Sequence, residues 1–226
     1  MENKNAYTGD DKKVTELKEE DGMKLYLVRH GETDWNKAKK VQGHSDIPLN
    51  DYGRELARKT AQGLKDVPFA VAYTSPLVRA RETAQLILAG RNVPLIEDRR
   101  IMELGFGIGE GMQFRGENKD PRSEDFDKFF NDTAHYVPLK DGETILELEE
   151  RVGDFLKDLY ADERWKDKDI LIATHGAALA AMLNCFEGQK DISKFWEGGV
   201  SRNCAVTIVE VENGSPKILE QGIIYY

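Results

Sequence analysis

The sequence has little of what membrane, secreted and nucleic-acid-binding proteins usually need. It contains only two cysteines, too few for a disulfide framework or a cysteine-based metal cluster. Its longest apolar stretches, such as 170–173 and 177–183, are much shorter than the roughly 20 residues that span a bilayer, so no membrane partner is expected. Basic residues number 32 against 41 acidic ones, and this net charge of −9 argues against a general nucleic-acid binder.

What is present is typical of a globular domain. Of the 226 residues, 40% are hydrophobic and 32% are charged, which suits one large core. Residues 1–22 are charged, poor in aliphatic side chains and without a signal-peptide core. We therefore expect a flexible tail at 1–22, a domain over 23–226 and a cytoplasmic location. Cys185 and Cys204 are interpreted as buried thiols in a reducing compartment.

Strand-like and helix-like segments alternate after the tail. The expected strands are 24–28, 70–74, 93–97, 169–174, 205–211 and, more weakly, 217–219. The expected helices include 51–65, capped by Asn50, then 76–89, capped by Ser75 with proline at its first position, and 144–160. This alternation predicts an α/β fold, a three-layer α/β/α sandwich with a mostly parallel central sheet.

One segment, at about 105–142, breaks this pattern. Four glycines follow Gly105 before Glu117, and several aromatic residues come after them, in a stretch too long for an ordinary connection. We expect a cap-like insertion or lid. A surface excursion that packs its own aromatic side chains is compatible with that expectation.

Two histidines and two arginines come directly after expected strands. His30 follows Arg29 at the end of the first strand, Arg79 comes soon after the second, and His175 follows the strand at 169–174. Ligands of open parallel sheets bind beyond the carboxyl ends of the strands, so these side chains are expected at one edge. Alone, either histidine is more often a structural turn residue, but the combination favours catalysis.

This set suits phosphoryl chemistry. Guanidinium groups donate in a fork that matches phosphate oxygens, and they stay charged at any working pH. A neutral imidazole can attack phosphorus and form a phosphohistidine, and neighbouring arginines favour its unprotonated state. The glycine after each histidine permits close backbone approach, and a nearby carbonyl can accept the proton of the other ring nitrogen.

The leaving oxygen needs a proton, which a carboxylic acid can supply. Glu103 is the preferred candidate because it opens the glycine-rich segment after a strand, and Glu32 and Glu110 are weaker rivals. The structural alternative for Glu103 is a surface ion pair with Arg99 or Arg100.

These motifs together resemble the histidine phosphatase superfamily, in its phosphoglycerate-mutase-like branch. The resemblance covers roughly residues 23–212 and rests on LVRHGETDWN at 27–36, SPLVRARETA at 75–84, the segment 103–111 and THG at 174–176. It implies that His30 is phosphorylated, that Glu103 donates the proton, and that no metal or cofactor is required. The implied phosphate or substrate contacts are Arg29, Asn36, Gln42, Gly43, Arg79, Glu103 and His175.

The same constellation serves a phosphatase or a bisphosphoglycerate-dependent phosphoglycerate mutase. After Glu103 the sequence departs from the mutase pattern, with no adjacent arginine pair before Gly142, so we prefer a phosphatase acting on a small phosphorylated metabolite, as a monomer or homodimer. Arg115, Lys119 and Arg122 are the residues that could grip a second anion. A silent phosphate-binding regulator and a metal-dependent phosphatase remain as other classes.

Overall fold

The computed structural model describes residues 22–226, and the expected tail at 1–22 lies outside them except for Gly22. A single sheet has the strand order β3-β2-β4-β1-β5-β6. Its strands are β1 (Met23–Arg29), β2 (Phe69–Thr74), β3 (Leu95–Glu97), β4 (Asp169–Thr174), β5 (Val206–Glu212) and β6 (Ser215–Ile223). The first four of that order pair in parallel, whereas β5 and β6 are antiparallel. The mostly parallel sheet is confirmed. The strand weakly predicted at 217–219 is part of the longer edge strand β6.

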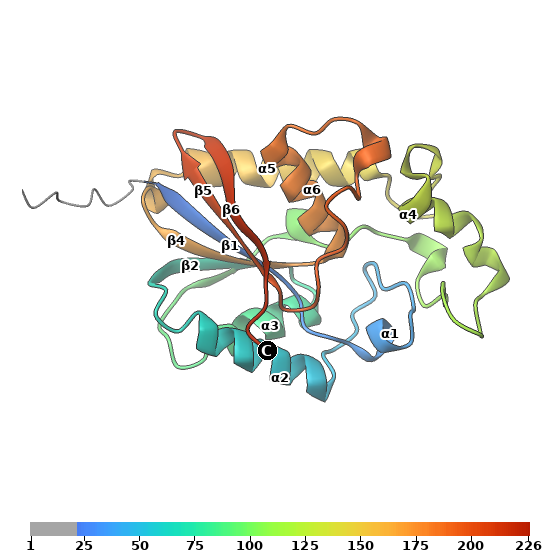
Figure 1. Ribbon diagram of the computed structural model, residues 1–226, viewed down its shortest axis with the longest axis horizontal. Coiled ribbons are helices and arrows are strands. Elements are labelled where there is room, and N and C mark those ends of the chain that lie inside the picture. The colour runs from blue at the N-terminus through green and yellow to red at the C-terminus, as the bar shows by residue number, and fades with distance from the viewer. Residues whose placement is uncertain (1–21) are drawn as a thin grey trace, which may run out of the picture.

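Helices cover both faces of this sheet, which confirms the three-layer arrangement. The α-helices are α1 (Asp34–Lys37), α2 (Asp51–Gly63), α3 (Val78–Ile87), α4 (Lys128–Asn131), α5 (Ile145–Ala161) and α6 (Gly176–Glu187). Figure 1 shows α5 and α6 on one face of the sheet and α2 and α3 on the other. Alternation along β1 divides the core between these faces: Leu25 and Leu27 belong to one buried cluster, and Val28 to the other.

The start of α3 differs from expectation. The structure begins this helix at Val78, two residues after the predicted start, and Ser75 is not its N-cap. Instead, the Asp46 carboxylate accepts the N–H of Val78 at 2.6 Å. A distant side chain supplies the cap, so the local sequence could not reveal it. At α2 the prediction is confirmed, because the side chain of Asn50 accepts from the N–H of Gly53 at 2.8 Å.

The segment 105–142 contains short turns and α4 rather than strands. Its 3₁₀ turns are η2 (Gly107–Gly109), η3 (Pro121–Ser123), η4 (Asp125–Asp127) and η5 (Thr133–His135), and elsewhere lie η1 (Arg99–Ile101), η6 (Glu163–Trp165) and η7 (Ile192–Lys194). We call 105–142 the cap. In Figure 1 it forms the end of the molecule beside α1.

Backbone hydrogen bonds and an aromatic cluster hold the cap. The N–H of Val41 donates to Met112 at 2.9 Å, and the N–H of Gly111 donates back to Val41 at 2.8 Å. Phe126 and Phe129 are buried against one another and against Phe106. The cap therefore packs its own aromatic side chains and is hydrogen-bonded to the loop after α1.

The two cysteines differ in exposure. Cys204 is buried, as expected, but the prediction for Cys185 is wrong because its side chain is exposed near the end of α6. The last turn of that helix leaves the core, so apolar periodicity before it did not extend to Cys185. Within residues 22–226, none of the helices combines the length and apolarity needed to cross a membrane.

Candidate active site

A cavity of about 100 Å³ lies at the carboxyl ends of β1 and β4, closed on one side by the cap. Seven of the eight predicted site residues line it: Arg29, His30, Asn36, Gln42, Gly43, Arg79 and Glu103. The eighth, His175, lies next to His30, with ring centroids 5.2 Å apart. The structure therefore brings the predicted residues together from four separate stretches of chain.

His30 is positioned as a neutral imidazole. It is 2% exposed, and its Nδ1 lies 2.7 Å from the carbonyl oxygen of Gly31. That contact assigns the proton to Nδ1, which donates to the carbonyl and leaves Nε2 unprotonated. Burial, followed by the charges of Arg79 and Arg29, holds the pKa of His30 well below its usual value. The ring is thus a neutral imidazole with an unprotonated Nε2, and it lies between two cationic side chains.

The close approach expected at Gly31 is present. A Cβ at Gly31 would lie 2.6 Å from the carbonyl oxygen of Gly53 in α2, so a larger side chain would push the His30 loop away from that helix. At Gly176 the nearest atom to such a Cβ is at 3.5 Å, an ordinary contact. The steric requirement therefore holds after His30 and not after His175.

His175 has polar atoms without a protein partner. Both ring nitrogens are buried, and neither makes a hydrogen bond within the described part of the chain. Burial lowers the pKa of His175 well below its usual value, and Arg79 and then His30 add to this effect. A buried neutral imidazole without partners is costly unless a ligand satisfies it. The geometry thus suits a hydrogen bond from His175 to a bound oxyanion.

The guanidinium groups of Arg29 and Arg79 donate some of their N–H groups to backbone carbonyls, and other N–H groups have no partner among the described residues. Arg79 is fully buried and donates to the carbonyls of Ser45 at 2.8 Å and Gly43 at 2.7 Å. Arg29 donates to the carbonyl of Ser201 at 2.6 Å. The Nε groups of both are buried and lack partners among the described residues. Burial lowers the pKa of Arg79 to about 10, which still leaves the guanidinium charged at neutral pH.

Asn36 and Gln42 are oriented by Thr33, a contact that sequence reasoning missed. The Thr33 hydroxyl lies 3.1 Å from Oδ1 of Asn36 and 3.0 Å from Oε1 of Gln42, and the Thr33 N–H donates to the same Asn36 oxygen. Both residues line the cavity, and the hydrogen bonds to Thr33 use only their side-chain oxygens. Two neutral donors thus join the two arginines.

Glu103 lines the cavity, and its carboxylate is held at the N-terminus of α6. Oε2 accepts from the N–H of Gly176 at 3.0 Å, and Oε1 accepts from Ala177 at 2.9 Å and Ala178 at 3.3 Å. The N–H groups and positive dipole end of a helix stabilise an anion in this way. The surface ion pair considered for Glu103 is absent from the described residues, and Arg100 pairs with Asp98 at 2.8 Å instead.

The rival carboxylates have structural partners. Glu110 accepts from the N–H groups of His44 and Ser45, each at 2.8 Å, and so holds the loop that carries Gly43. Glu32 accepts from the amide of Asn50 at 3.0 Å. The cavity lining includes Glu103 and neither rival, which keeps Glu103 as the candidate acid.

The segment 201–204 also supports the site, and no sequence pattern indicated this role. Asn203 donates through its side-chain amide to the carbonyl of His30 at 2.9 Å, and the N–H of Cys204 donates to the carbonyl of Arg29 at 2.9 Å. With the Ser201 contact, three hydrogen bonds join this loop to the Arg29–His30 pair. The partners lie too far apart along the chain for a local pattern to show the contact.

Apart from Lys40, the rest of the cavity lining is apolar. Its lining includes Phe106, Phe114, Phe126, Phe129, Phe130 and Trp196. The cap supplies the phenylalanines, whereas Trp196 comes from the loop after η7 and was missed by sequence reasoning. Trp196 donates through Nε1 to the carbonyl of Phe129 at 2.7 Å, which fixes its ring against the cap.

Two cationic side chains of the cap form ion pairs within the cap. Lys119 pairs with Asp127 at 2.5 Å and Arg122 with Asp120 at 2.7 Å. The guanidinium of Arg115 lies 5.4 Å from the ring centroid of Phe130, stacked on the outside of the aromatic lining. Within the described chain, no group of three or more His, Cys, Asp or Glu side chains is arranged to hold a metal ion.

A sheet edge with a buried neutral histidine, two cations and a carboxylate fits the class of enzymes that transfer a phosphoryl group through a histidine. The profile of the histidine phosphatase superfamily (branch 1) matches residues 25–223. The chain therefore belongs to this superfamily.

Some similar proteins are named as phosphatases and others as mutases. Phosphoserine phosphatase 1 of Hydrogenobacter thermophilus is 31% identical over 201 residues, covering 89% of this chain and 92% of its own. Probable phosphoglycerate mutase GpmB of Serratia proteamaculans is 33% identical over 190 residues, covering 83% and 85%. The solved structure of Bacillus stearothermophilus YhfR has a TM-score of 0.81 and 30% identity, covering 89% of this chain and 97% of its own.

Proposed function

We propose that this enzyme hydrolyses a small phosphomonoester through a phosphohistidine at His30. The observation that carries the proposal is the buried, neutral His30 with its Nε2 free, in a cavity lined by Arg29 and Arg79. Covalent transfer to a histidine divides one difficult displacement into two easier ones.

In the first step, Nε2 of His30 forms a bond to phosphorus, and the bond from phosphorus to the ester oxygen breaks. The electron pair of that bond goes to the departing oxygen, which takes a proton from Glu103. In the second step, water attacks the phosphohistidine and gives its proton to Glu103, releasing inorganic phosphate and restoring His30. In the structure the Glu103 carboxylate accepts from the N–H groups of Gly176 and Ala177, which is compatible with the acceptor role proposed for the second step.

The transferring group is held by charge and by neutral donors. Arg29, Arg79 and His175 would contact its oxygens, together with the amides of Asn36 and Gln42 and the backbone beside Gly43. The unpartnered nitrogens of Arg29, Arg79 and His175 support this role, because a bound phosphoryl group satisfies them and stabilises developing negative charge.

For the substrate, we propose an ester whose organic part contacts the aromatic lining. The relative named phosphoserine phosphatase supports a small metabolite, and the six aromatic side chains favour a body with apolar surface. A mutase must hold a second anionic group, and the pairing of Lys119 with Asp127 and Arg122 with Asp120 disfavours that second candidate.

The test is a panel of phosphorylated metabolites, including phosphoglycerates with and without bisphosphoglycerate, assayed for free phosphate and for isomer. We expect free phosphate, full activity in a metal chelator and no turnover by His30→Ala. Isomer as the main product would favour the mutase, loss of activity in chelator a metal enzyme, and phosphate binding without turnover a silent regulator.

We further propose a cytoplasmic location and a monomer or homodimer. An exposed free thiol at Cys185 supports a reducing compartment. Size-exclusion chromatography with light scattering tests the oligomeric state.

A further inference from the structure

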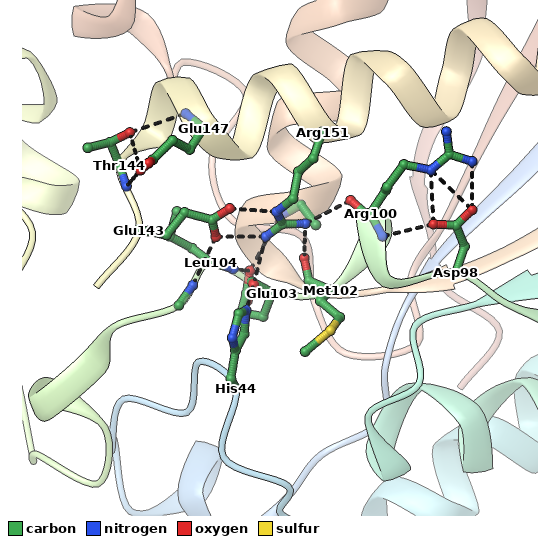
Figure 2. A network of polar contacts seen from close by, with 12 residues as sticks. His44, Asp98, Arg100, Met102, Glu103, Leu104, Glu143, Thr144, Glu147 and Arg151 are labelled. Carbon is green, nitrogen blue, oxygen red and sulfur yellow. Dashed lines mark hydrogen bonds and ion pairs between the residues drawn. The ribbon is translucent and has the colours of Figure 1, made fainter. Parts of the chain in front are cut away.

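The segment that carries Glu103 is held by one arginine of α5. Residues 99–105 run from η1 into the start of the cap, and none of them belongs to a strand of the sheet. In Figure 2, Arg151 reaches from α5 to the backbone of this segment. Its Nη1 donates to the carbonyls of Arg100 at 2.7 Å and Met102 at 2.8 Å, and its Nη2 donates to that of Glu103 at 2.9 Å.

The guanidinium is itself fixed by an ion pair with Glu143. Nε of Arg151 lies 2.6 Å from one carboxylate oxygen of Glu143, and Nη2 lies 2.8 Å from the other. The two side chains are only 19% and 17% exposed. Glu143 also accepts from the N–H of Gly105 at 3.1 Å, on the far side of Glu103. All five N–H groups of Arg151 are therefore used, and the bonds bracket Glu103 along the chain.

The carboxylate of Glu103 is anchored from the opposite direction. Its side chain accepts from the N-terminus of α6, while its main chain is held from α5 by Arg151 and from the loop after α1 by His44, whose Nε2 lies 2.8 Å from the Glu103 carbonyl. Glu103 thus bridges two helices, and Arg151 determines the position of its backbone relative to the cavity.

We propose that Arg151, oriented by Glu143, is a positioning residue that aligns Glu103 for proton transfer to the departing oxygen. This inference rests on the proposed function, because it assigns Glu103 the role of acid. A displacement of about 1 Å at a reacting group is worth roughly 100-fold in rate. A lysine keeps the charge but has three N–H groups on one nitrogen, so it cannot reproduce five bonds in a fixed fork.

The experiment measures kcat/KM for a series of phosphate esters with leaving groups of graded acidity, from p-nitrophenyl to an unactivated alkyl ester. This quantity reports the steps up to phosphorylation of His30, and a good leaving group needs no proton there. In Arg151→Lys and Glu143→Gln, we expect kcat/KM to fall about 100-fold for the alkyl ester and less than about threefold for p-nitrophenyl phosphate.

Arg100→Gln is the matched control. Arg100 joins the same two elements as Arg151, through ion pairs to Asp98 at 2.8 Å and to Asp158 of α5 at 2.5 Å, and its side chain does not contact Glu103. We expect this variant to lose thermal stability without a change in the dependence on leaving group. The same selective loss in Arg100→Gln, or equal losses across the series in the Arg151 and Glu143 variants, would show a merely structural role.

Each preparation is normalised by the fraction of His30 that becomes phosphorylated in a single turnover with p-nitrophenyl phosphate, which removes unfolded protein from the comparison. If the wild-type enzyme turns over without labelling His30, the proposed function fails. If His30 is labelled throughout but the leaving-group dependence is unchanged, only the positioning role of Arg151 fails.

Discussion

The imidazole rings of His30 and His175 lie with their centroids 5.2 Å apart and their planes inclined by 58°. Two charged imidazoles would repel at this separation, with Arg29 and Arg79 adding to the repulsion. The pair is compatible with burial only because both rings are neutral, the state in which one can attack phosphorus and the other can donate to an oxyanion. This contact joins the ends of β1 and β4, which are neighbours in the sheet.

The neutral pair predicts how stability depends on pH. Because the folded-state pKa of each ring lies below its unfolded value of 6.5, the unfolded chain binds more protons once the pH falls below that value. The free energy of unfolding should be fully retained above pH 6.5 and should fall by about 1.4 kcal/mol per pH unit per ring as the pH decreases.

Urea unfolding at pH 7.5, 6.5 and 5.5 measures this dependence. The variant His30→Gln should have a shallower decline than the wild type, since one of the two rings is gone. An equal slope in both proteins, or stability that increases on acidification, would contradict the assignment of neutral buried rings.

Removal of the carboxylic acid should be selective among substrates. Glu103→Gln keeps the shape of the side chain and cannot donate an acidic proton, so kcat/KM should fall by about 100-fold or more for alkyl esters and little for p-nitrophenyl phosphate. Dephosphorylation of His30 should slow as well, because the same group accepts the proton of water. Glu32→Gln is the control, and it should leave both steps unchanged. Equal losses for every ester would remove Glu103 from the acid role.

Much of this site could be predicted from the sequence because its reactive side chains directly follow strands. The parallel pairing of β1 and β4 places Arg29 at the end of β1, His30 directly after it and His175 after β4 at one edge of the sheet. The supporting contacts could not be predicted in this way. Asn203 meets His30, and Arg151 meets Glu103, only through tertiary packing, and Asp46 caps α3 from a remote loop.

The exposure of Cys185 marks another limit of the sequence. Apolar residues continue through α6 up to Leu183, and a regular pattern says nothing about where the end of a helix leaves the core. Likewise Trp196 is one aromatic residue in a loop, and tertiary contacts with Phe129 and Phe130 place it in the cavity.

The aromatic lining predicts a selective change in substrate preference. Trp196→Ala should raise KM for aryl phosphates about tenfold, since a buried aromatic contact of roughly 1.4 kcal/mol is lost. The KM for an alkyl phosphate with a short polar body should change little. Trp165→Ala is a suitable control because Trp165, which donates to Tyr73 at 3.0 Å, does not line the cavity. Equal changes for both substrate types would show that the lining does not contact the organic part.

Substitutions that weaken the contacts of loop 201–204 should lower activity to different degrees. Asn203→Ala removes the donor to the His30 carbonyl and should lower kcat about 10-fold or more, with KM less affected, because it displaces the nucleophile. Tyr226→Phe removes only the hydroxyl that donates to the Asn203 carbonyl at 2.7 Å, so its effect should be smaller. Steady-state kinetics of both variants test this order. A larger loss of kcat in Tyr226→Phe than in Asn203→Ala would contradict the prediction.

The covalent intermediate is the most direct test of the whole account. The enzyme in molar excess is mixed with a phosphomonoester carrying radiolabelled phosphate, quenched within one turnover, digested and mapped. We expect a phosphoryl group that is stable in base and labile in acid, bound to the peptide containing His30 and absent from His30→Ala. Release of phosphate by the wild-type enzyme with no label on that peptide at any time point would contradict it.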